Sequence, residues 1–176
     1  MSRYRAGQVT RRNKMMLEWG VVIVFIGVII GAIIYHNRTP LIPIKVQNEA
    51  NFAIFYPNSN NQIRVEKNTI KYNTSLGQVS YIVDFAGKKI TFAEQTEPVS
   101  FTADPTFYTS FVENLRGYAS FDSINGHVDL TFPGQVNSQT AVMVTKGTLL
   151  FAKASGNISE LNWRFLFNDL NFTQPK

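Results

Sequence analysis

The sequence predicts an α+β protein, in which one N-terminal transmembrane helix precedes an antiparallel β-sheet domain with two helices packed on it. Three observations predict this class. A run of seventeen uncharged residues lies near the N-terminus, and apolar residues alternate with a period near two after residue 52. Two later segments carry apolar residues at spacings of three and four. The length of 176 residues leaves room for one folded domain, which we assign to residues 52–176.

The apolar run is WGVVIVFIGVIIGAIIY, residues 19–35, and it contains neither a charged residue nor a proline. At ~1.5 Å per helical residue, this run and the apolar residues just before it match the ~30 Å hydrocarbon core of a bilayer. We therefore predict a membrane anchor here, in contact with the lipid bilayer. Its key residues are Trp19, Phe25, Gly27, Gly31 and Tyr35.

The flanking charges predict the orientation of this anchor. Residues 1–18 form a tail with five basic residues and one acidic residue, whereas from residue 35 onward twelve basic residues face eleven acidic ones. Because basic flanks stay on the cytoplasmic side, we expect a single-pass plasma-membrane protein with a cytoplasmic N-terminus and an extracytoplasmic domain. A cleaved signal peptide is the alternative, but no small-x-small cleavage site follows Ile34.

Gly27 and Gly31 form a GxxxG pattern, through which two anchors could pack closely and form a homo-oligomer. A type IV pilin is a further alternative, because Glu18 lies just before the apolar helix and after a basic leader. The pilin match is poor, since no glycine precedes a suitable cleavage point.

After the anchor, residues 36–51 contain Pro40 and Pro43 and have no helical period. This composition predicts an extended stalk between membrane and domain. The alternative is that the apolar residues of this segment pack as a first edge strand. Those residues are Leu41, Ile42, Ile44 and Val46.

The first part of the domain predicts successive antiparallel strands, because its apolar residues recur at every second position. The expected strands lie near residues 52–57, 63–72, 79–85 and 90–92. A helix follows, with Asp104 as its N-cap and Pro105 at its first position, and Gly117 is expected to end it.

Two hairpins and a final helix are predicted after Gly117. Asn125-Gly126 is the strongest hairpin turn signal, and Lys146-Gly147 joins two strands that are apolar on both faces, as in a sheet covered by helices. The last helix is expected to begin at an Asn157 N-cap and to extend to Leu170.

The order of these patterns resembles a family of single-pass, extracytoplasmic proteins of unknown function from small-genome bacteria. The segments that carry the resemblance are 56–57, 77–95, 107–115 and 139–170. The domain is more distantly similar to lipoprotein and anti-sigma-associated domains of Gram-positive bacteria, whose PsbP-like fold has an antiparallel sheet with helices on both faces. The resemblance implies an accessory or binding domain, with no catalytic residues to assign.

The composition excludes several chemistries. The chain has no cysteine, which excludes thiolate catalysis and cysteine-ligated metals, and we expect no cofactor or metal. The near-neutral domain lacks the positive surface of a nucleic-acid-binding protein. His36 is expected at the membrane surface and His127 in solvent, so neither predicts catalysis.

Four carboxylates could support a hydrolase if two of them met in one pocket. They are Asp84, Glu94, Glu97 and Asp104, and their spacing favours solvated side chains instead. Most aromatic residues fall on core-facing periods, but Phe101, Phe132 and Phe172 do not. These three are the candidate contact surface.

Together these observations predict a membrane-anchored, extracytoplasmic, non-catalytic binding or accessory domain. Its partner is expected to be another envelope protein or an envelope component. A regulatory sensor is the alternative, although eighteen cytoplasmic residues are too few for a folded output module.

Overall fold

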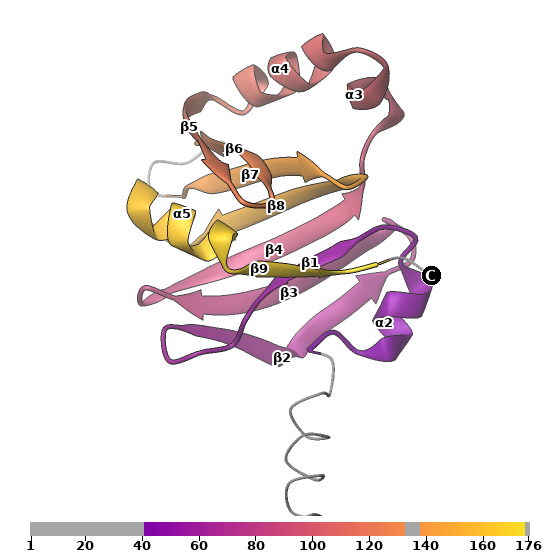
Figure 1. Cartoon of the computed structure of the whole chain (residues 1–176), viewed down its shortest axis with the longest axis vertical. Helices are drawn as coiled ribbons and strands as arrows, with labels where there is room; N and C mark the ends of the chain where they lie inside the picture. Colours follow the sequence, from indigo (N-terminus) through magenta and orange to yellow (C-terminus); the bar gives the residue numbers. More distant parts are fainter. Residues whose placement is uncertain (1–40, 133–137, 175–176) are drawn as a thin grey trace, which may run out of the picture. The chain divides into compact units, whose positions relative to one another are not determined.

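The computed structural model describes residues 41–132 and 138–174, and residues 41–176 form one compact unit (Figure 1). Three predicted segments lie wholly or partly outside the described residues. They are the cytoplasmic tail, the transmembrane helix at residues 19–35 and the first part of the stalk. Within the described ranges, no helix is long and apolar enough to cross a bilayer. The predicted anchor therefore stays a prediction from the sequence.

A seven-stranded antiparallel sheet forms the centre of the domain, with strand order β2-β3-β4-β8-β7-β6-β5 (Figure 1). This sheet confirms the predicted α+β class. The bounds are β2 Ile63–Asn73, β3 Gln78–Phe85, β4 Lys88–Thr96, β5 Gly117–Ser123, β6 Gly126–Thr131, β7 Thr140–Thr145 and β8 Thr148–Ala154.

Both predicted hairpins are present. β7 and β8 pair across Lys146-Gly147, as predicted. β5 and β6 pair across Ile124-Asn125, one residue before the predicted turn, because Gly126 pairs with Ser123 as the first residue of β6. Lys146 and Gly147 have φ of 48° and 72°, the left-handed pair that lets a two-residue turn follow the twist of its strands. The turn chemistry in the sequence therefore places four of the seven strands correctly.

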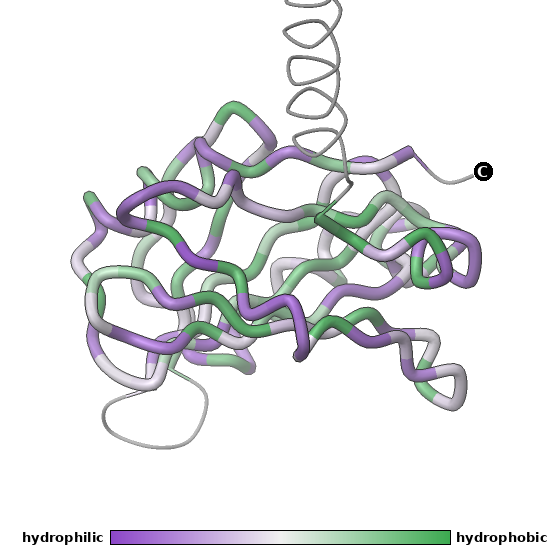
Figure 2. Tube along the Cα trace, turned by 90° about the horizontal axis from the view of Figure 1, so that it is seen from below, coloured by the Kyte–Doolittle hydropathy of each residue, from purple (hydrophilic) through white to green (hydrophobic). Residues whose placement is uncertain are grey.

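One face of the sheet carries the main core. Alternate side chains of β3 are buried, and Figure 2 shows hydrophobic and hydrophilic residues following one another along the strands. Helix α5, Glu160–Asn168, packs on this face through Trp163, Leu166 and Phe167. Its N-cap is Ser159 and not the predicted Asn157, because the Ser159 hydroxyl accepts the Asn162 N–H at 3.3 Å.

A two-stranded ribbon crosses the same core. It consists of β1, Ile54–Pro57, and β9, Leu170–Thr173, which pair antiparallel. β1 was predicted, but β9 was not, and Leu170 was wrongly included in the last helix. The helix ends at Asn168, and Leu170 is buried as the first residue of β9, because its backbone pairs with Pro57.

The prediction of an extended segment is wrong for residues 44–49, which form helix α2, Ile44–Glu49. The alternative of an edge strand is wrong as well. Ile42, Val46 and Ala50 are buried in the core, and their spacing of four residues is the helical period that the sequence analysis overlooked. The last part of the predicted stalk thus belongs to the folded domain.

The opposite face of the sheet carries helices α3, Val99–Ala103, and α4, Pro105–Asn114 (Figure 1). The predicted cap of α4 is confirmed, since Asp104 Oδ1 accepts the Thr106 N–H at 2.9 Å. The short α3 was not predicted. Phe111 of α4 contacts Phe151, which opposes Ala93 and Val142 and so faces away from the main core. The two helices predicted to pack on the sheet, α4 and α5, therefore lie on opposite faces.

Candidate binding site beside helices α3 and α4

An aromatic group joins α3 and α4 to the sheet. Phe101 of α3 lies 5.5 Å from Tyr108 and 5.3 Å from Phe111, measured between ring centroids. Phe111 in turn lies 6.0 Å from Phe151 of β8. All four rings are half-buried, and neither α3 nor α4 has a fully buried residue. The contact between these helices and the sheet is therefore a thin layer of aromatic side chains.

A chain of polar contacts runs from α4 along the hairpin β5–β6. The Tyr108 hydroxyl donates to Asp129 Oδ2 at 2.7 Å, and His127 Nε2 lies 3.7 Å from Asp129 Oδ1. His127 Nδ1 lies 2.7 Å from Asp122 Oδ1. Burial is the larger cause that raises the pKa of Tyr108, and the Asp129 carboxylate is the smaller one. The hydroxyl therefore keeps its proton and remains a donor.

His127 therefore has partners that the sequence analysis did not predict. Its side chain is 54% exposed, in line with the expected solvent position, yet it lies between two carboxylates. The signal was present in the sequence. Asp122 and His127 occupy opposing positions across the hairpin, and Asp129 follows His127 by two residues on the same face of its strand.

A pocket of about 280 Å³ opens beside this chain of contacts. Its lining combines apolar and aromatic side chains with an acid and an imidazole. The lining residues are Glu97, Phe101, Pro105, Tyr108, Thr109, His127 and Val144. The volume lies at the lower end of ligand pockets and suits one inserted side chain better than a large cofactor.

The segment around the pocket is acidic. Residues 97–129 contain five acidic residues and one basic residue, a net charge of −4 with histidine neutral. The acidic residues are Glu97, Asp104, Glu113, Asp122 and Asp129, and the basic one is Arg116. A negative field of this kind favours a partner surface of positive charge.

The three candidate contact residues belong to three different aromatic groups. Phe101 lines the pocket described above. Phe132 stacks on Tyr118 at 4.1 Å, and Phe172 lies 5.6 Å from Phe55 on the side of the main core. Only Phe101 thus takes part in the candidate site.

Two exposed apolar residues of α3 and α4 were missed. Val99 is 83% exposed and Phe107 is 55% exposed. Phe107 is one of the aromatic residues that were expected on a core-facing period, since it lies four residues before Phe111. In the structure α4 lies on the sheet through Tyr108 and Phe111, and so Phe107 points to solvent.

The four carboxylates considered for hydrolysis have four different surroundings. Asp84 lies 3.7 Å from Lys89, on the face opposite to the main core. Glu97 lines the pocket beside α3, and Asp104 caps α4, where hydrogen bonds from Thr106 lower its pKa. Glu94 is fully buried. The hydrolase alternative thus loses the paired carboxylates on which it depended.

Glu94 has a strongly altered acidity. Its Oε2 accepts the Phe55 N–H at 2.7 Å, and its Oε1 lies 3.1 Å from the Tyr81 hydroxyl. Burial raises the pKa of Glu94 to about 8, although these two hydrogen bonds act in the opposite direction. Glu94 is thus an acid enclosed in the core, and not the solvated carboxylate that its spacing predicted.

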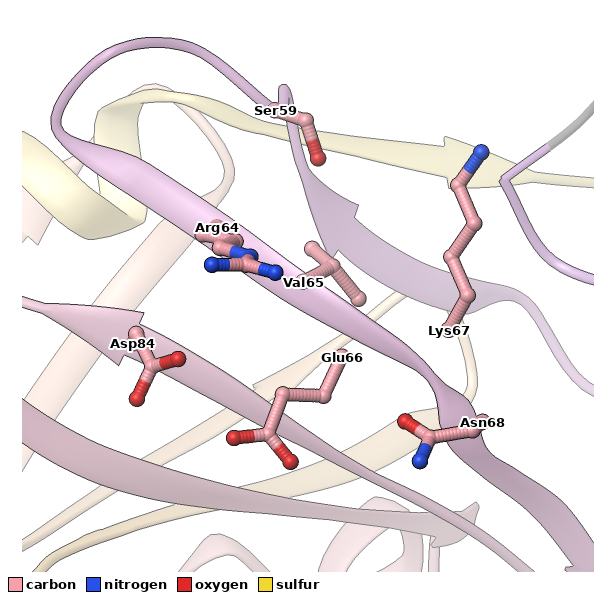
Figure 3. Close-up of a pocket in the computed structure, with 7 residues that line it drawn as sticks. All are labelled: Ser59, Arg64, Val65, Glu66, Lys67, Asn68 and Asp84. Carbon is pink, nitrogen blue, oxygen red and sulfur yellow. The ribbon is translucent and has the colours of Figure 1, made fainter.

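A second pocket, of about 730 Å³, lies beside β2 (Figure 3). Figure 3 shows Arg64, Glu66 and Asp84 near one another, with Lys67 extending away from them. Lys89 pairs with both Glu66 and Asp84. Because cations and carboxylates neutralise each other here, the charge of this pocket favours neither an anionic nor a cationic ligand.

The candidate site contains no metal-binding arrangement. Among residues 41–132 and 138–174, no group of three or more histidine and carboxylate side chains could hold a metal ion.

No family model, curated protein or solved structure matches the chain. A functional assignment therefore has to come from the residues themselves.

Proposed function

We propose that this chain is a membrane-anchored, extracytoplasmic and non-catalytic binding domain, which contacts another envelope protein through the surface formed by α3 and α4. The partner segment presents an apolar side chain and basic residues. The apolar side chain enters the pocket beside Phe101 and Tyr108, and the basic residues face the surrounding carboxylates.

One observation carries this proposal. Helices α3 and α4 bury none of their residues, and they leave Val99 and Phe107 in solvent. Other residues of the same two helices, Phe101 and Tyr108 among them, line a pocket. A helix that only supported the core would bury part of its apolar face, as α5 does with Trp163, Leu166 and Phe167. Exposed apolar residues next to a concave site are typical of protein contacts.

The charge supports the choice of partner. The segment 97–129 has a net charge of −4, whereas residues 62–89 on the other half of the sheet have five basic and two acidic residues, a net charge of +3. A basic partner is attracted to the first segment and repelled by the second. The charges of the two segments thus orient the partner, while its apolar side chain in the pocket holds the contact.

The predicted anchor supports the mechanism. An uncharged run of seventeen residues behind a basic tail restricts the domain to the membrane plane. Restriction to a surface raises the effective concentration of a partner in the same membrane, so a small contact suffices. This account requires the domain to lie outside the cytoplasm, as the flanking charges predict.

Site-specific photo-crosslinking in intact membranes tests the proposal. A benzophenone amino acid replaces Phe107 in the full chain, and a matched variant carries it at Leu161, an exposed residue of α5. We expect one discrete adduct from position 107, weakened at high ionic strength, and none from position 161. Equal adducts from both positions, or none from position 107, would contradict the proposed surface.

The membrane topology has a separate test. Protease added to intact cells is expected to digest residues 41–176 and to spare the N-terminal tail. Protection of the domain would contradict the extracytoplasmic location, while leaving the crosslinking result at position 107 interpretable on its own.

A further inference from the structure

The β1–β9 ribbon is attached to the seven-stranded sheet in an unusual way. The ribbon is a sheet of its own and shares no backbone ladder with the seven strands. Three side chains from adjacent strands hold β1 and the residue before it instead. They are Tyr81 of β3, Glu94 of β4 and Thr148 of β8, and we call them the ribbon clamp.

Each clamp residue makes a short hydrogen bond to the backbone of the ribbon segment. The Tyr81 hydroxyl donates to Phe55 O at 2.6 Å, and the Thr148 hydroxyl donates to Ala53 O at 2.7 Å. Glu94 Oε2 accepts the Phe55 N–H at 2.7 Å. All three side chains are at most 1% exposed, so the clamp is closed to water.

Counting protons assigns the state of Glu94. The Tyr81 hydroxyl has one hydrogen, and the 2.6 Å contact with Phe55 O uses it. The contact of 3.1 Å between Tyr81 Oη and Glu94 Oε1 then needs a second hydrogen, which only Glu94 can supply. A neutral Glu94 closes the ring of hydrogen bonds, because Oε1–H donates to Tyr81 and Oε2 accepts from Phe55.

Hydrogen bonds from its neighbours offset only part of the cost of burying an ionised Glu94, since burial is the largest influence on its pKa. Within residues 41–132 and 138–174, no basic side chain forms an ion pair with it. Tyr81 is the titratable group that faces it from β3. β9 carries no titratable residue, β1 carries only Tyr56, and Lys153 of β8 is exposed. In α2, Lys45 and Glu49 pair with each other.

We propose that the ribbon clamp closes only when Glu94 carries a proton, and that ionisation of Glu94 releases the β1–β9 ribbon from the seven-stranded sheet. A buried carboxylate without a cation is costly, and hydration removes that cost. Water reaches Glu94 when β1 moves, because β1 covers it. The domain thus has a pH-sensitive strap in its β1–β9 ribbon.

The direction of the pH effect follows from the two states. Burial raises the pKa of Glu94 to about 8 in the closed clamp, whereas a hydrated Glu94 titrates near its ordinary value of 4.5. Below the ordinary value both states are neutral and the clamp has its full stability. Between the two pKa values, Glu94 is protonated in the closed state and ionised in the open state. Opening then releases a proton, so its equilibrium constant rises about tenfold per pH unit. The loss is complete above about pH 8.

Glu94→Gln provides a matched variant. A glutamine amide keeps the acceptor for the Phe55 N–H and supplies an N–H donor for the Tyr81 hydroxyl, so it reproduces the neutral acid without titrating. Glu113→Gln, at an exposed position of α4, is the control for the loss of a surface carboxylate. Both variants are made in the full chain.

Hydrogen exchange followed by mass spectrometry tests the release. Comparing the wild type with Glu94→Gln at the same pH cancels the intrinsic pH dependence of exchange. The expected result concerns peptides that cover residues 52–57 and 170–173. For these peptides, the ratio of the wild-type to the variant exchange rate should rise about tenfold for each pH unit between pH 6 and 8. Glu113→Gln is expected to follow the wild type.

Two exchange results would overturn the proposal. The first is a rate ratio that does not change with pH. The second is an equal acceleration of peptides from β5 and β6, residues 117–131, because that would mean unfolding of the whole domain and not release of the ribbon.

A second measurement avoids any variant that fails to fold. Carbon-13 labelling of the seven glutamates allows their side-chain carboxyls to be titrated in the wild-type chain. We expect one signal to titrate near pH 8 and to broaden or shift together with the ribbon amides. If every glutamate titrates in the ordinary range, Glu94 is not the proton carrier and the proposal is wrong.

Discussion

The two faces of the seven-stranded sheet are covered very differently. On one face, α5, the ribbon and α2 bury large side chains such as Trp163, Phe55 and Ile42 completely. On the other face, α3 and α4 bury none of their own residues and contact the sheet through half-buried aromatic rings. The first face therefore contributes most of the stability of the domain, whereas the second leaves apolar side chains exposed to solvent.

The polar groups differ in the same way. On the core face, Glu94, Tyr81 and Thr148 are sealed from water and bind backbone groups of the ribbon. On the α3–α4 face, Asp122, His127 and Asp129 stay partly exposed. A buried network of this kind contributes to fold specificity and stability, whereas an exposed one remains available to a partner.

Trp163→Ala is the substitution expected to have the largest effect. Trp163 is fully buried on the core face, and its loss removes both burial and packing, so the free energy of unfolding should fall by about 4 kcal/mol. Urea unfolding of the full chain, followed by far-ultraviolet circular dichroism, measures this. A loss below about 1 kcal/mol would mean that the core face does not dominate stability.

Tyr81→Phe tests the clamp on the same face. The ring still fills its site, but Phe55 O and the acid of Glu94 lose their partner, and a buried unpaired polar group costs about 2 kcal/mol. Urea unfolding at pH 6 gives the value. Tyr72→Phe, at a half-buried position of β2, is the control and should change stability by less than about 0.5 kcal/mol.

The sequence predicted much of the fold for reasons that can be stated. The Lys146-Gly147 turn requires left-handed backbone angles, and Asn125-Gly126 marks the β5–β6 hairpin to within one residue, so both hairpins are signalled locally. The Asp104-Pro105 pair marks a helix start because the Asp104 carboxylate caps a free N–H group of the first turn and proline fixes the φ of the first helical residue. These signals depend on a few neighbouring residues, and therefore they can be recognised without the structure.

What the sequence did not reveal depends on distant contacts. β9 is four residues long, and its strand conformation depends on pairing with β1, which lies far away in the sequence. Glu94 has the sequence context of a surface carboxylate, and only the fold brings Phe55 and Tyr81 against it. The orientation of α4, which exposes Phe107, depends on which aromatic rings meet the sheet. The candidate site was therefore only partly predictable, through Phe101.

Phe111→Ala sharpens the comparison from the α4 side. The ring is half-buried and contacts Phe151 and Phe101, so its loss should cost about 1 kcal/mol, the size of one aromatic pair. The same urea unfolding assay is used as for Trp163→Ala. A cost as large as that of Trp163→Ala would show that α4 is part of the main core and would remove the contrast between the faces.

Phe107→Ser is expected to have the smallest effect on stability and the largest effect on binding. Phe107 is 55% exposed, so replacing it should change the free energy of unfolding by less than about 0.5 kcal/mol. With a benzophenone amino acid placed at Val99 as the probe, the same substitution should abolish the adduct, because it removes an exposed apolar contact from the proposed surface. Leu161→Ser on α5 is the matched control and should leave both stability and crosslinking unchanged. If Phe107→Ser destabilised the domain strongly, Phe107 would belong to the packing of the domain, and the separation of a stabilising face from a binding face would fail.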